Sequence, residues 1–210
     1  SATALLTGEP MTLAYYRHAG LRQWVRQVAA QRPLLASVVF SSAMAPYARP
    51  YAPRVPMLVD FVDVDSAKWT QYAPNHRWPM SWIYRREGQR LLAYERAVAA
   101  EARRSFFVTP AEVALFTGQA PETADRVQAV GNGVDSAYFA PDAARANPFA
   151  ADEQAIVFTG AMDYWPNVDA VTWFAQDVLP LLRQRWPAAR LHVVGRSPTP
   201  AVLALAGPQV

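Results

Sequence analysis

Three aspartates stand close together in the first third of the chain, at Asp60, Asp63 and Asp65. They follow a short apolar segment, and carboxylates at the end of a strand are costly unless they are solvated, paired or bound to a ligand. One of them could act as a base or orient an acceptor hydroxyl. We therefore predict that these residues are catalytic. In the structural alternative they cap the loop and pair with Lys68 or Arg77.

Two serines, Ser41 and Ser42, follow another short apolar segment. Their hydroxyls could donate hydrogen bonds to a substrate, and a cap or a turn is the alternative. No G-x-S-x-G motif surrounds them, which argues against the nucleophile of a hydrolase.

A stretch rich in aromatic and basic residues begins at Lys68 and Trp69. Tryptophan and tyrosine rings stack on sugars and also anchor proteins at membrane interfaces, where neighbouring arginines attract anionic lipid. A peripheral membrane face is one hypothesis, and core packing of most of these rings is the other. The stretch comprises Lys68, Trp69, Tyr72, Arg77, Trp78, Trp82, Tyr84, Arg85 and Arg86.

A fourth candidate is the turn over residues 159–167, between an expected strand and an expected helix. Gly160 would let the backbone approach a ligand closely, and the N-terminus of the next helix suits an anion. We expect Asn167 to cap that helix. Arg196, after Gly195, could donate two hydrogen bonds to a phosphate. A plain loop and a solvent-exposed arginine are the alternatives. Neither the P-loop motif nor G-x-G-x-x-G is present.

Composition limits the classes of function. The chain has 210 residues, of which 52% are apolar and 18% charged, so it is globular. The net charge of +3 suits phosphates and nucleotides but is too small to indicate nucleic acid. The lack of cysteine excludes disulfides and thiolate metal sites and fits the cytoplasm. His18, His76 and His192 are too scattered for a metal site, and no apolar run reaches the roughly 20 residues that span a bilayer.

Apolar segments and helical periodicities alternate along the chain. The expected strands are 34–40, 56–62, 105–108, 127–130, 155–159 and 191–194, and the expected helices are 21–31, 81–104, one that starts at Pro110, and 169–186. Residues 47–56 are expected to be a loop, and residues 63–79 a loop with at most one helical turn. Thr109 and Glu112 predict a capping box. Glu87, Glu95 and Glu101 alternate with arginines and predict a solvated helix face. The class is therefore α/β, in which ligands bind at the carboxyl ends of parallel strands.

Residues 131–149 contain two glycines and two prolines, which marks a domain boundary. A complete βαβ pattern follows. We expect a first domain over 1–131, a linker over 132–150 and the start of a second domain over 151–210. The chain stops at 207–210, where another strand is expected. Both sheets are therefore expected to be incomplete, with open edges that favour a dimer.

The segment Val130-Gly131-Asn132-Gly133-Val134-Asp135, followed by Phe139-Ala140-Pro141, resembles part of the family 4 retaining glycosyltransferases, which have the GT-B fold. The run 157–170, with Trp173-Phe174 and Val193-Val194-Gly195, is similar to the opening of that family's second domain. Segments 40–44 and 60–69 resemble a bacterial branch linked to exopolysaccharide assembly. The resemblance covers nearly the whole chain.

The resemblance implies two Rossmann-like parallel-sheet domains, the first on the acceptor side and the second on the donor side. It implies that the parent enzyme transfers a sugar with retention from a nucleotide sugar to a glycan or lipid-linked acceptor, in the cytoplasm or peripherally on the inner membrane, without a cofactor or an essential metal. The acceptor would contact Ser41, Ser42, Lys68 and Trp69. The donor would contact Gly160, Ala161, Met162, Asp163, Asn167, Gly195 and Arg196.

The chain also departs from the family pattern. Many relatives carry an arginine and a lysine on the loop where this chain has Ala161 and Trp165-Pro166-Asn167. Many carry a histidine where this chain has its aspartates. The family's E-x7-E motif is expected downstream of Val210, and its first glycine-rich loop upstream of Ser1. We therefore expect the chain to be inactive alone.

Two other interpretations stay open. Asp63-Val64-Asp65 matches the D-x-D pattern that holds Mn²⁺ in a different, GT-A class of glycosyltransferase. The chain could also be a non-catalytic binding module. The second βαβ pattern after residue 131 favours the GT-B interpretation over the D-x-D one.

Overall fold

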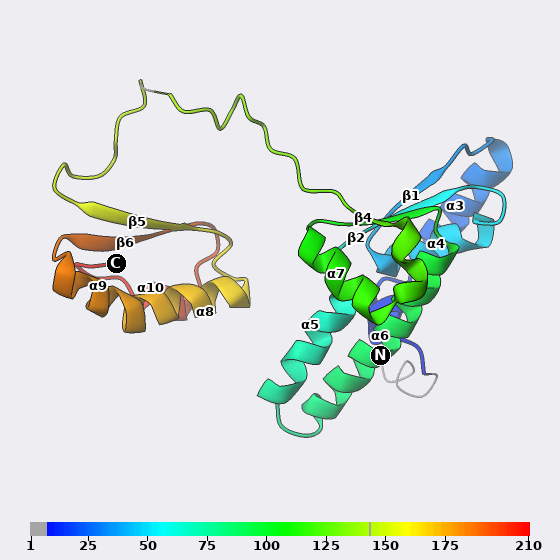
Figure 1. Ribbon diagram of the computed structural model, residues 1–210, viewed down its shortest axis with the longest axis horizontal. Coiled ribbons are helices and arrows are strands. Elements are labelled where there is room, and N and C mark those ends of the chain that lie inside the picture. Colours follow the sequence, from blue (N-terminus) through cyan, green and yellow to red (C-terminus); the bar gives the residue numbers. More distant parts are fainter. Residues whose placement is uncertain (1–7, 143) are drawn as a thin grey trace. The chain divides into compact units, whose positions relative to one another are not determined.

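The computed structural model describes residues 8–142 and 144–210. The chain divides between Asp135 and Ser136 into two compact units, each of which is α/β with parallel strands (Figure 1). This division falls inside the range predicted as a linker. Residues 1–7 of the first predicted domain and residue 143 of the linker lie outside the described residues.

The first unit contains a four-stranded parallel sheet in the order β1-β2-β3-β4. Its strands are β1 (Ser37–Phe40), β2 (Met57–Val62), β3 (Arg104–Phe107) and β4 (Val127–Ala129). Alternate residues of β2 are buried, namely Met57, Val59 and Phe61. This period of two is typical of a strand with one face in a core. All four strands end at the same edge of the sheet because they are parallel.

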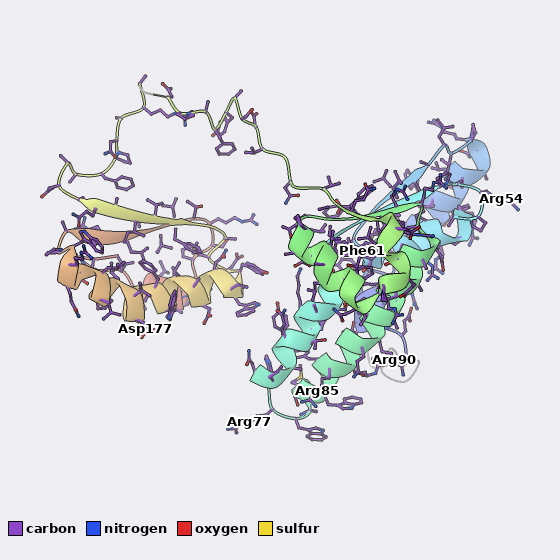
Figure 2. All side chains as sticks on the ribbon, in the orientation of Figure 1. Arg54, Phe61, Arg77, Arg85, Arg90 and Asp177 are labelled. Carbon is purple, nitrogen blue, oxygen red and sulfur yellow. The ribbon has the colours of Figure 1, made fainter. Side chains whose placement is uncertain are left out.

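The helices of the first unit pack mainly against one face of this sheet (Figure 1). They are α2 (Met11–Tyr15), α3 (Ala19–Gln31), α4 (Ala45–Ala48), α5 (Asp65–Tyr72), α6 (Met80–Glu101) and α7 (Pro110–Gln119). Short 3-10 turns are η1 (Ser42–Met44), η2 (Arg49–Tyr51), η3 (Ala73–Asn75) and η4 (Pro121–Arg126). The core lies between the sheet and α6 and α7 and includes Phe61 (Figure 2). The ring of Phe107 stacks on Phe61 at 5.1 Å and contacts Phe116 at 5.0 Å between centroids. On the opposite face of β1, Val38 and Phe40 are exposed.

Two predicted loops of this unit are partly helical. Residues 63–79 contain α5 and η3, and residues 47–56 contain the end of α4 and η2. The prediction for 63–79, a loop with at most one helical turn, underestimated the helix because α5 depends on distant contacts that its polar sequence does not reveal. Gly88 of α6 is one of them: a Cβ atom there would overlap Thr70 Oγ1 and lie 3.0 Å from the Ser66 carbonyl oxygen. Only glycine allows α5 and α6 to approach this closely.

The second unit contains two parallel strands, β5 (Gln154–Thr159) and β6 (Ala189–Val194). One face is covered by α8 (Trp165–Trp173), the π-helical turn η5 (Phe174–Val178), α9 (Leu179–Arg185) and α10 (Pro200–Leu203) (Figure 1). The core includes Val171, Leu179 and Leu191.

The helix predicted over 169–186 begins earlier, at Trp165, and is interrupted by η5. Pro180 has no N–H to donate back along the helix. In the turn just before it, the Leu179 N–H reaches the Phe174 carbonyl oxygen, five residues back, as in a π-bulge. At the end of the chain, the Gln209 carbonyl accepts a hydrogen bond from the Leu191 N–H at 2.9 Å, so the last residues run beside β6. None of the helices in the described part of the chain is long and apolar enough to cross a bilayer.

Candidate functional site

A cavity of about 440 Å³ lies at the carboxyl ends of the strands of the first unit. Three segments far apart in the sequence line it: α2, the turn after β1 and α5. They bring together three of the predicted site residues, Ser41, Asp65 and Trp69. The other lining residues, which the sequence did not indicate, are Met11, Thr12, Tyr15 and Tyr16. Aromatic rings beside a carboxylate and a hydroxyl form a surface suited to a sugar or another polyol.

The backbone is strained beside this cavity. Ser41 and Val62, at the ends of β1 and β2, both have φ 69°. The left-handed region is unfavourable for a β-branched residue such as Val62, and the β2–β3 register shifts between Asp60 and Val62. Asp60 holds this geometry, because its Oδ1 accepts from the Val62 N–H at 3.0 Å and its carbonyl accepts from the Ser41 N–H at 2.7 Å. Strain of this kind costs about 1–3 kcal/mol per residue and concentrates at functional sites.

Lys68 joins the other two aspartates of the predicted cluster. Its Nζ lies 2.8 Å from Asp63 Oδ2 and 3.1 Å from Asp65 Oδ1. Partial burial alone would lower the pKa of Lys68, but the hydrogen bonds that its ammonium donates to the two carboxylates outweigh this effect, and the pKa is raised. The three aspartates therefore have different environments: Asp60 is bound to backbone, whereas Asp63 and Asp65 share one ammonium group. Both shared carboxylates are about a third exposed and accessible to a ligand.

Behind Lys68 and its two aspartates lies the buried carboxyl of Glu95 in α6, a residue that is 1% exposed. Its Oε2 accepts from Ser66 Oγ at 2.6 Å and its Oε1 from the Ser66 N–H at 3.3 Å, which fixes the first turn of α5. Burial raises the pKa of Glu95 to about 8, the hydrogen bonds from Ser66 offset part of that rise, and the charge of Asp65 adds to it. A carboxyl whose pKa is raised by burial to about 8 is thus bonded to Ser66, the residue next to Asp65 on the cavity wall.

A second buried carboxyl, Glu87, holds the opposite wall of the cavity. Its Oε2 accepts from the Met11 N–H at 2.8 Å, and its Oε1 accepts from the Thr12 N–H at 2.9 Å and from Thr12 Oγ1 at 2.8 Å. These bonds satisfy free N–H groups at the start of α2. Glu87 is fully buried.

The prediction of a solvated face with Glu87 and Glu95 was therefore wrong. Only Glu101 follows it, since this residue is exposed and pairs with Arg49. The spacing of Glu87, Leu91, Glu95 and Val98, at intervals of three or four residues, places them on one helix face. Because Leu91 and Val98 are apolar, this spacing was the signal that could have identified the two glutamates as buried.

The loop that carries the aspartates is also fixed from α7. Thr109 caps α7 as predicted, with its Oγ1 accepting from the Glu112 N–H at 3.1 Å. Glu112 does not complete a capping box. Its Oε2 instead accepts from the Val64 N–H at 2.6 Å, between Asp63 and Asp65. A side chain expected to cap its own helix therefore positions the candidate site.

Ser42 and Trp69 differ in their access to the cavity. Ser42 is buried in η1, which corrects the expectation that its hydroxyl faces a substrate. Trp69 lines the cavity and packs on Tyr84 of α6 at 5.4 Å between ring centroids. Of the predicted acceptor residues, Ser41 and Trp69 therefore line the cavity directly, and Lys68 acts on it through Asp65.

In the second unit, β5 and β6 approach each other closely at their carboxyl ends. The Gly160 N–H donates to the Val194 carbonyl at 3.0 Å. A Cβ atom on Gly195 would overlap the carbonyl oxygen of Gly160, so only glycine fits there. Ser197, two residues further on, has φ 53°. Among the described residues, the three non-glycine residues with positive φ (Ser41, Val62 and Ser197) thus all lie at or just after the carboxyl ends of strands.

Two predicted donor residues have structural roles in this turn. Met162 is buried in the core of the unit and its N–H donates to the Arg196 carbonyl at 2.9 Å, so its side chain does not face a ligand. Asn167 does not cap α8, because the helix already begins at Trp165. Its Nδ2 instead donates to the Ala161 carbonyl at 3.0 Å and holds the turn closed over Gly160. Asp163 and Arg196, the charged pair of the prediction, are both exposed.

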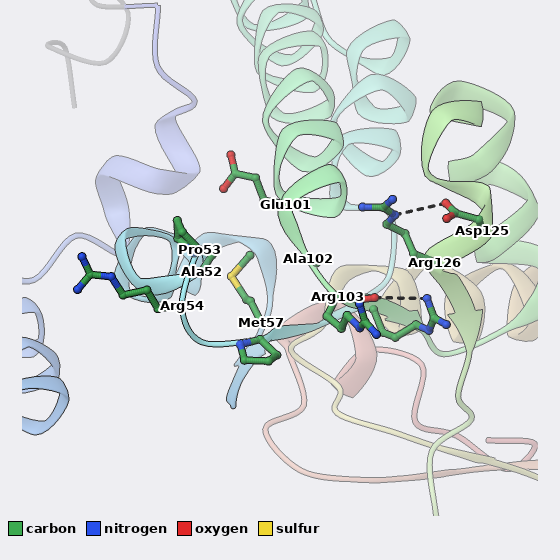
Figure 3. Close-up of a pocket in the computed structure, with 11 residues that line it drawn as sticks. Ala52, Pro53, Arg54, Met57, Glu101, Ala102, Arg103, Asp125 and Arg126 are labelled. Carbon is green, nitrogen blue, oxygen red and sulfur yellow. Dashed lines mark hydrogen bonds and ion pairs between the residues drawn. The ribbon is translucent and has the colours of Figure 1, made fainter. Parts of the chain in front are cut away.

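A further cavity of the first unit, about 480 Å³ in volume, lies at the amino ends of β2 and β3 (Figure 3). The arginines that line it are Arg54, Arg103, Arg104 and Arg126. Arg126 donates to the Ala100 carbonyl at 2.9 Å, close to the C-terminus of α6, where a cation is favourable. Because ligands of parallel sheets bind at the opposite edge, we assign no catalytic role to this cavity.

In the described ranges 8–142 and 144–210, no three histidine, aspartate or glutamate side chains are placed to share a metal ion. Comparison with models of known protein families finds no match, and a search of curated proteins finds none either. What the structure defines is the class: an α/β protein of two units, each with a parallel sheet, compatible with a Rossmann-like fold.

Proposed function

We propose that the chain is part of a GT-B glycosyltransferase of the family 4 type. The parent enzyme would transfer a sugar, with retention, from a nucleotide-sugar donor to a glycan or lipid-linked acceptor in exopolysaccharide biosynthesis. The first unit would bind the acceptor and the second would begin the donor site. This activity needs no cofactor, and we place it in the cytoplasm or on the inner face of the membrane.

The cavity at the carboxyl edge of the first sheet is the observation that carries the proposal. Trp69 and Tyr15 offer ring surfaces, while Ser41 and Asp65 offer a hydroxyl and a carboxylate, and all four line the same cavity. Sugars are bound in proteins by this combination of ring stacking and hydrogen bonds. Asp63 and Asp65 would accept hydrogen bonds from acceptor hydroxyls and orient them for transfer.

The donor side is supported by the turn between β5 and α8. The close contact of Gly160 with Gly195 leaves backbone without side chains at the carboxyl ends of both strands, which lets a diphosphate approach. The N-terminus of α8 supplies a favourable dipole, and Arg196, whose carbonyl accepts from the Met162 N–H of the same turn, supplies a positive charge. The negative charge of Asp163 repels a phosphate. For a phosphate to bind, its attraction to Arg196 and to the helix N-terminus must outweigh this repulsion.

The D-x-D interpretation is the second candidate, since Asp63 and Asp65 do converge. The group between them is the Lys68 ammonium, which occupies the position of a shared cation. We therefore expect titration calorimetry to detect no Mn²⁺ binding to the wild-type chain. Mn²⁺ binding that is lost in Asp63→Asn would favour the D-x-D class instead.

Saturation-transfer NMR on the whole 210-residue chain tests the proposal. We expect saturation of the sugar and ribose protons of UDP- or GDP-hexoses, and separately of oligosaccharide acceptors. Trp69→Ala should abolish the acceptor signal and keep the donor signal, because Trp69 belongs to the first unit. Arg196→Gln should have the opposite effect. Trp24→Ala, which removes an exposed tryptophan of α3, is the matched control.

Absence of any donor or acceptor signal from the wild-type chain would contradict the proposal. Equal loss of signal in the Trp24 and Trp69 variants would show that saturation reports non-specific contact with tryptophan. Acceptor binding without donor binding would instead support the interpretation as a non-catalytic sugar-binding module.

A further inference from the structure

The turn between α5 and α6 exposes an unusual set of apolar side chains. Trp78 is 81% exposed and Trp82 is 53% exposed, and Met80 between them is also exposed. Burial of a large aromatic side chain is favourable by about 2–3 kcal/mol, so leaving two of them in water is costly. An exposed apolar group of this kind on a protruding turn indicates contact with another apolar phase or surface.

Positive charge surrounds these side chains. Between Asp65 and Glu87 the sequence contains no acidic residue, whereas it contains a lysine and three arginines. Arg77 and Arg85 lie at the end of the helical hairpin formed by α5 and α6, away from the sheet (Figure 2). Among the described residues, neither of these two arginines forms an ion pair. Their charge is therefore available to an anionic surface.

The turn is held in place by the two helices below it. Tyr84 of α6 contacts both Trp69 and Tyr72 of α5, at 5.4 and 6.4 Å between ring centroids, and also His76 at 4.8 Å. The His76 ring nitrogen is hydrogen-bonded to the Tyr72 carbonyl at 2.9 Å. This packing leaves the inner aromatic residues of the stretch, Trp69, Tyr72 and Tyr84, half-buried against one another, whereas Trp78 and Trp82 stay exposed.

We propose that the α5–α6 turn is a membrane-binding site, with Trp78, Met80 and Trp82 in the interfacial region of an anionic bilayer and Arg77 and Arg85 at its headgroups. Charge complementarity decides the partner. Tryptophan is favourable at the depth of the headgroups, and arginine is attracted to anionic lipid there. An acidic protein would also attract the arginines, but the tryptophans at a protruding tip fit the interface better than a flat contact.

The site also explains how the cavity would meet a lipid-linked substrate, and this step depends on the proposed function. Trp69 and Asp65 line the cavity, and α5 runs from Asp65 to Tyr72 toward the turn. At 1.5 Å per residue, these ends of α5 are about 10 Å apart along the axis. The proposed bilayer contacts lie further on, after η3 (Ala73–Asn75), so a lipid-linked acceptor would have to extend along the whole of α5 and this turn to reach the cavity.

Co-sedimentation of the whole chain with vesicles tests the binding site without any substrate. We expect the chain to pellet with vesicles containing phosphatidylglycerol and to remain in solution with pure phosphatidylcholine. Each arginine near such a surface is worth about a fivefold change in partitioning, so Arg77→Gln with Arg85→Gln should weaken it roughly thirtyfold. Trp78→Ala with Trp82→Ala should weaken it at least about tenfold.

Matched controls on α3 keep the test specific. Trp24→Ala removes another exposed tryptophan, and Arg22→Gln with Arg26→Gln removes two other arginines. Both controls should bind vesicles like the wild type, and circular dichroism should show all variants folded. Equal partitioning to neutral and anionic vesicles, or equal weakening by the control and the turn variants, would overturn the proposal. Vesicle binding together with failed sugar binding would leave the membrane site standing and reject only the proposed function.

Discussion

Glu95 is a buried carboxyl that is hydrogen-bonded to Ser66, and its replacement by glutamine should change how stability depends on pH. Burial raises the pKa of Glu95 from 4.5 to about 8. The folded chain therefore keeps a proton there that the unfolded chain has already released. Glutamine has nearly the same shape and never ionises. Its carbonyl can accept one hydrogen bond from Ser66, and its amide can donate to Ser66 Oγ.

The sign of the effect follows from the raised pKa. A group with a higher pKa in the folded state stabilises most at low pH, and that contribution is lost as the pH rises through the folded value. One pKa unit is equivalent to about 1.4 kcal/mol. Because of Glu95, the unfolding free energy of the first unit should therefore fall by about 4 kcal/mol as the pH rises from about 5 to about 9. In Glu95→Gln this loss should be absent, and the variant should be the more stable protein at about pH 9.

Hydrogen exchange of the α6 and β2 amides, measured across this pH range, reports on the first unit alone. Glu101→Gln is the control, since it makes the same chemical change at an exposed position of the same helix. It should keep the pH dependence of the wild type. Equal pH dependence in wild type and Glu95→Gln, or a Glu95 carboxyl that titrates near 4.5 in carbon-detected NMR, would show that burial does not raise the pKa of this group.

Three further substitutions test other contacts. Gly195→Ala should destabilise the second unit by more than about 2 kcal/mol in urea denaturation, because its Cβ overlaps the Gly160 carbonyl; an unchanged midpoint would contradict the close approach of β5 and β6. Glu87→Ala should release α2 and speed proteolysis near Met11, since it removes three hydrogen bonds of about 1.5–3 kcal/mol each, whereas protection equal to wild type would show that α2 is held otherwise. Lys68→Met should cost only about 1 kcal/mol, because both of its ion pairs are partly exposed; a loss several times larger would mean that the two aspartates need their lysine to fold.

Local patterns in the sequence predicted most of the strands and the place where the chain divides. A strand such as β2 depends on its own alternation of buried and exposed residues, and the composition of residues 131–149 is visible without any partner. The α5 helix could not be predicted this way. Its sequence is polar and aromatic, and its stability comes from Ser66 bonding to Glu95 and from the close approach that Gly88 permits.

The predicted site residues were likewise visible in local sequence patterns, whereas the residues that were missed depend on contacts between distant segments. Asp63 and Asp65 are conspicuous because acidic residues after an apolar segment are unusual. Tyr15 reaches the cavity only because Glu87, more than seventy residues away, fixes the start of α2. Such contacts between distant segments leave no local pattern in the sequence.

A single helix, α6, determines the geometry of the whole candidate site. Glu87 holds α2 on one side of the cavity, and two turns further on Glu95 holds the first turn of α5 on the other. Gly88, next to Glu87, sets the distance between α5 and α6, and the same pair of helices presents the exposed tryptophans at its tip. A change on the buried face of α6 should therefore alter the cavity and the α5–α6 turn together. A change at Trp78 should alter the turn alone, because Trp78 does not line the cavity.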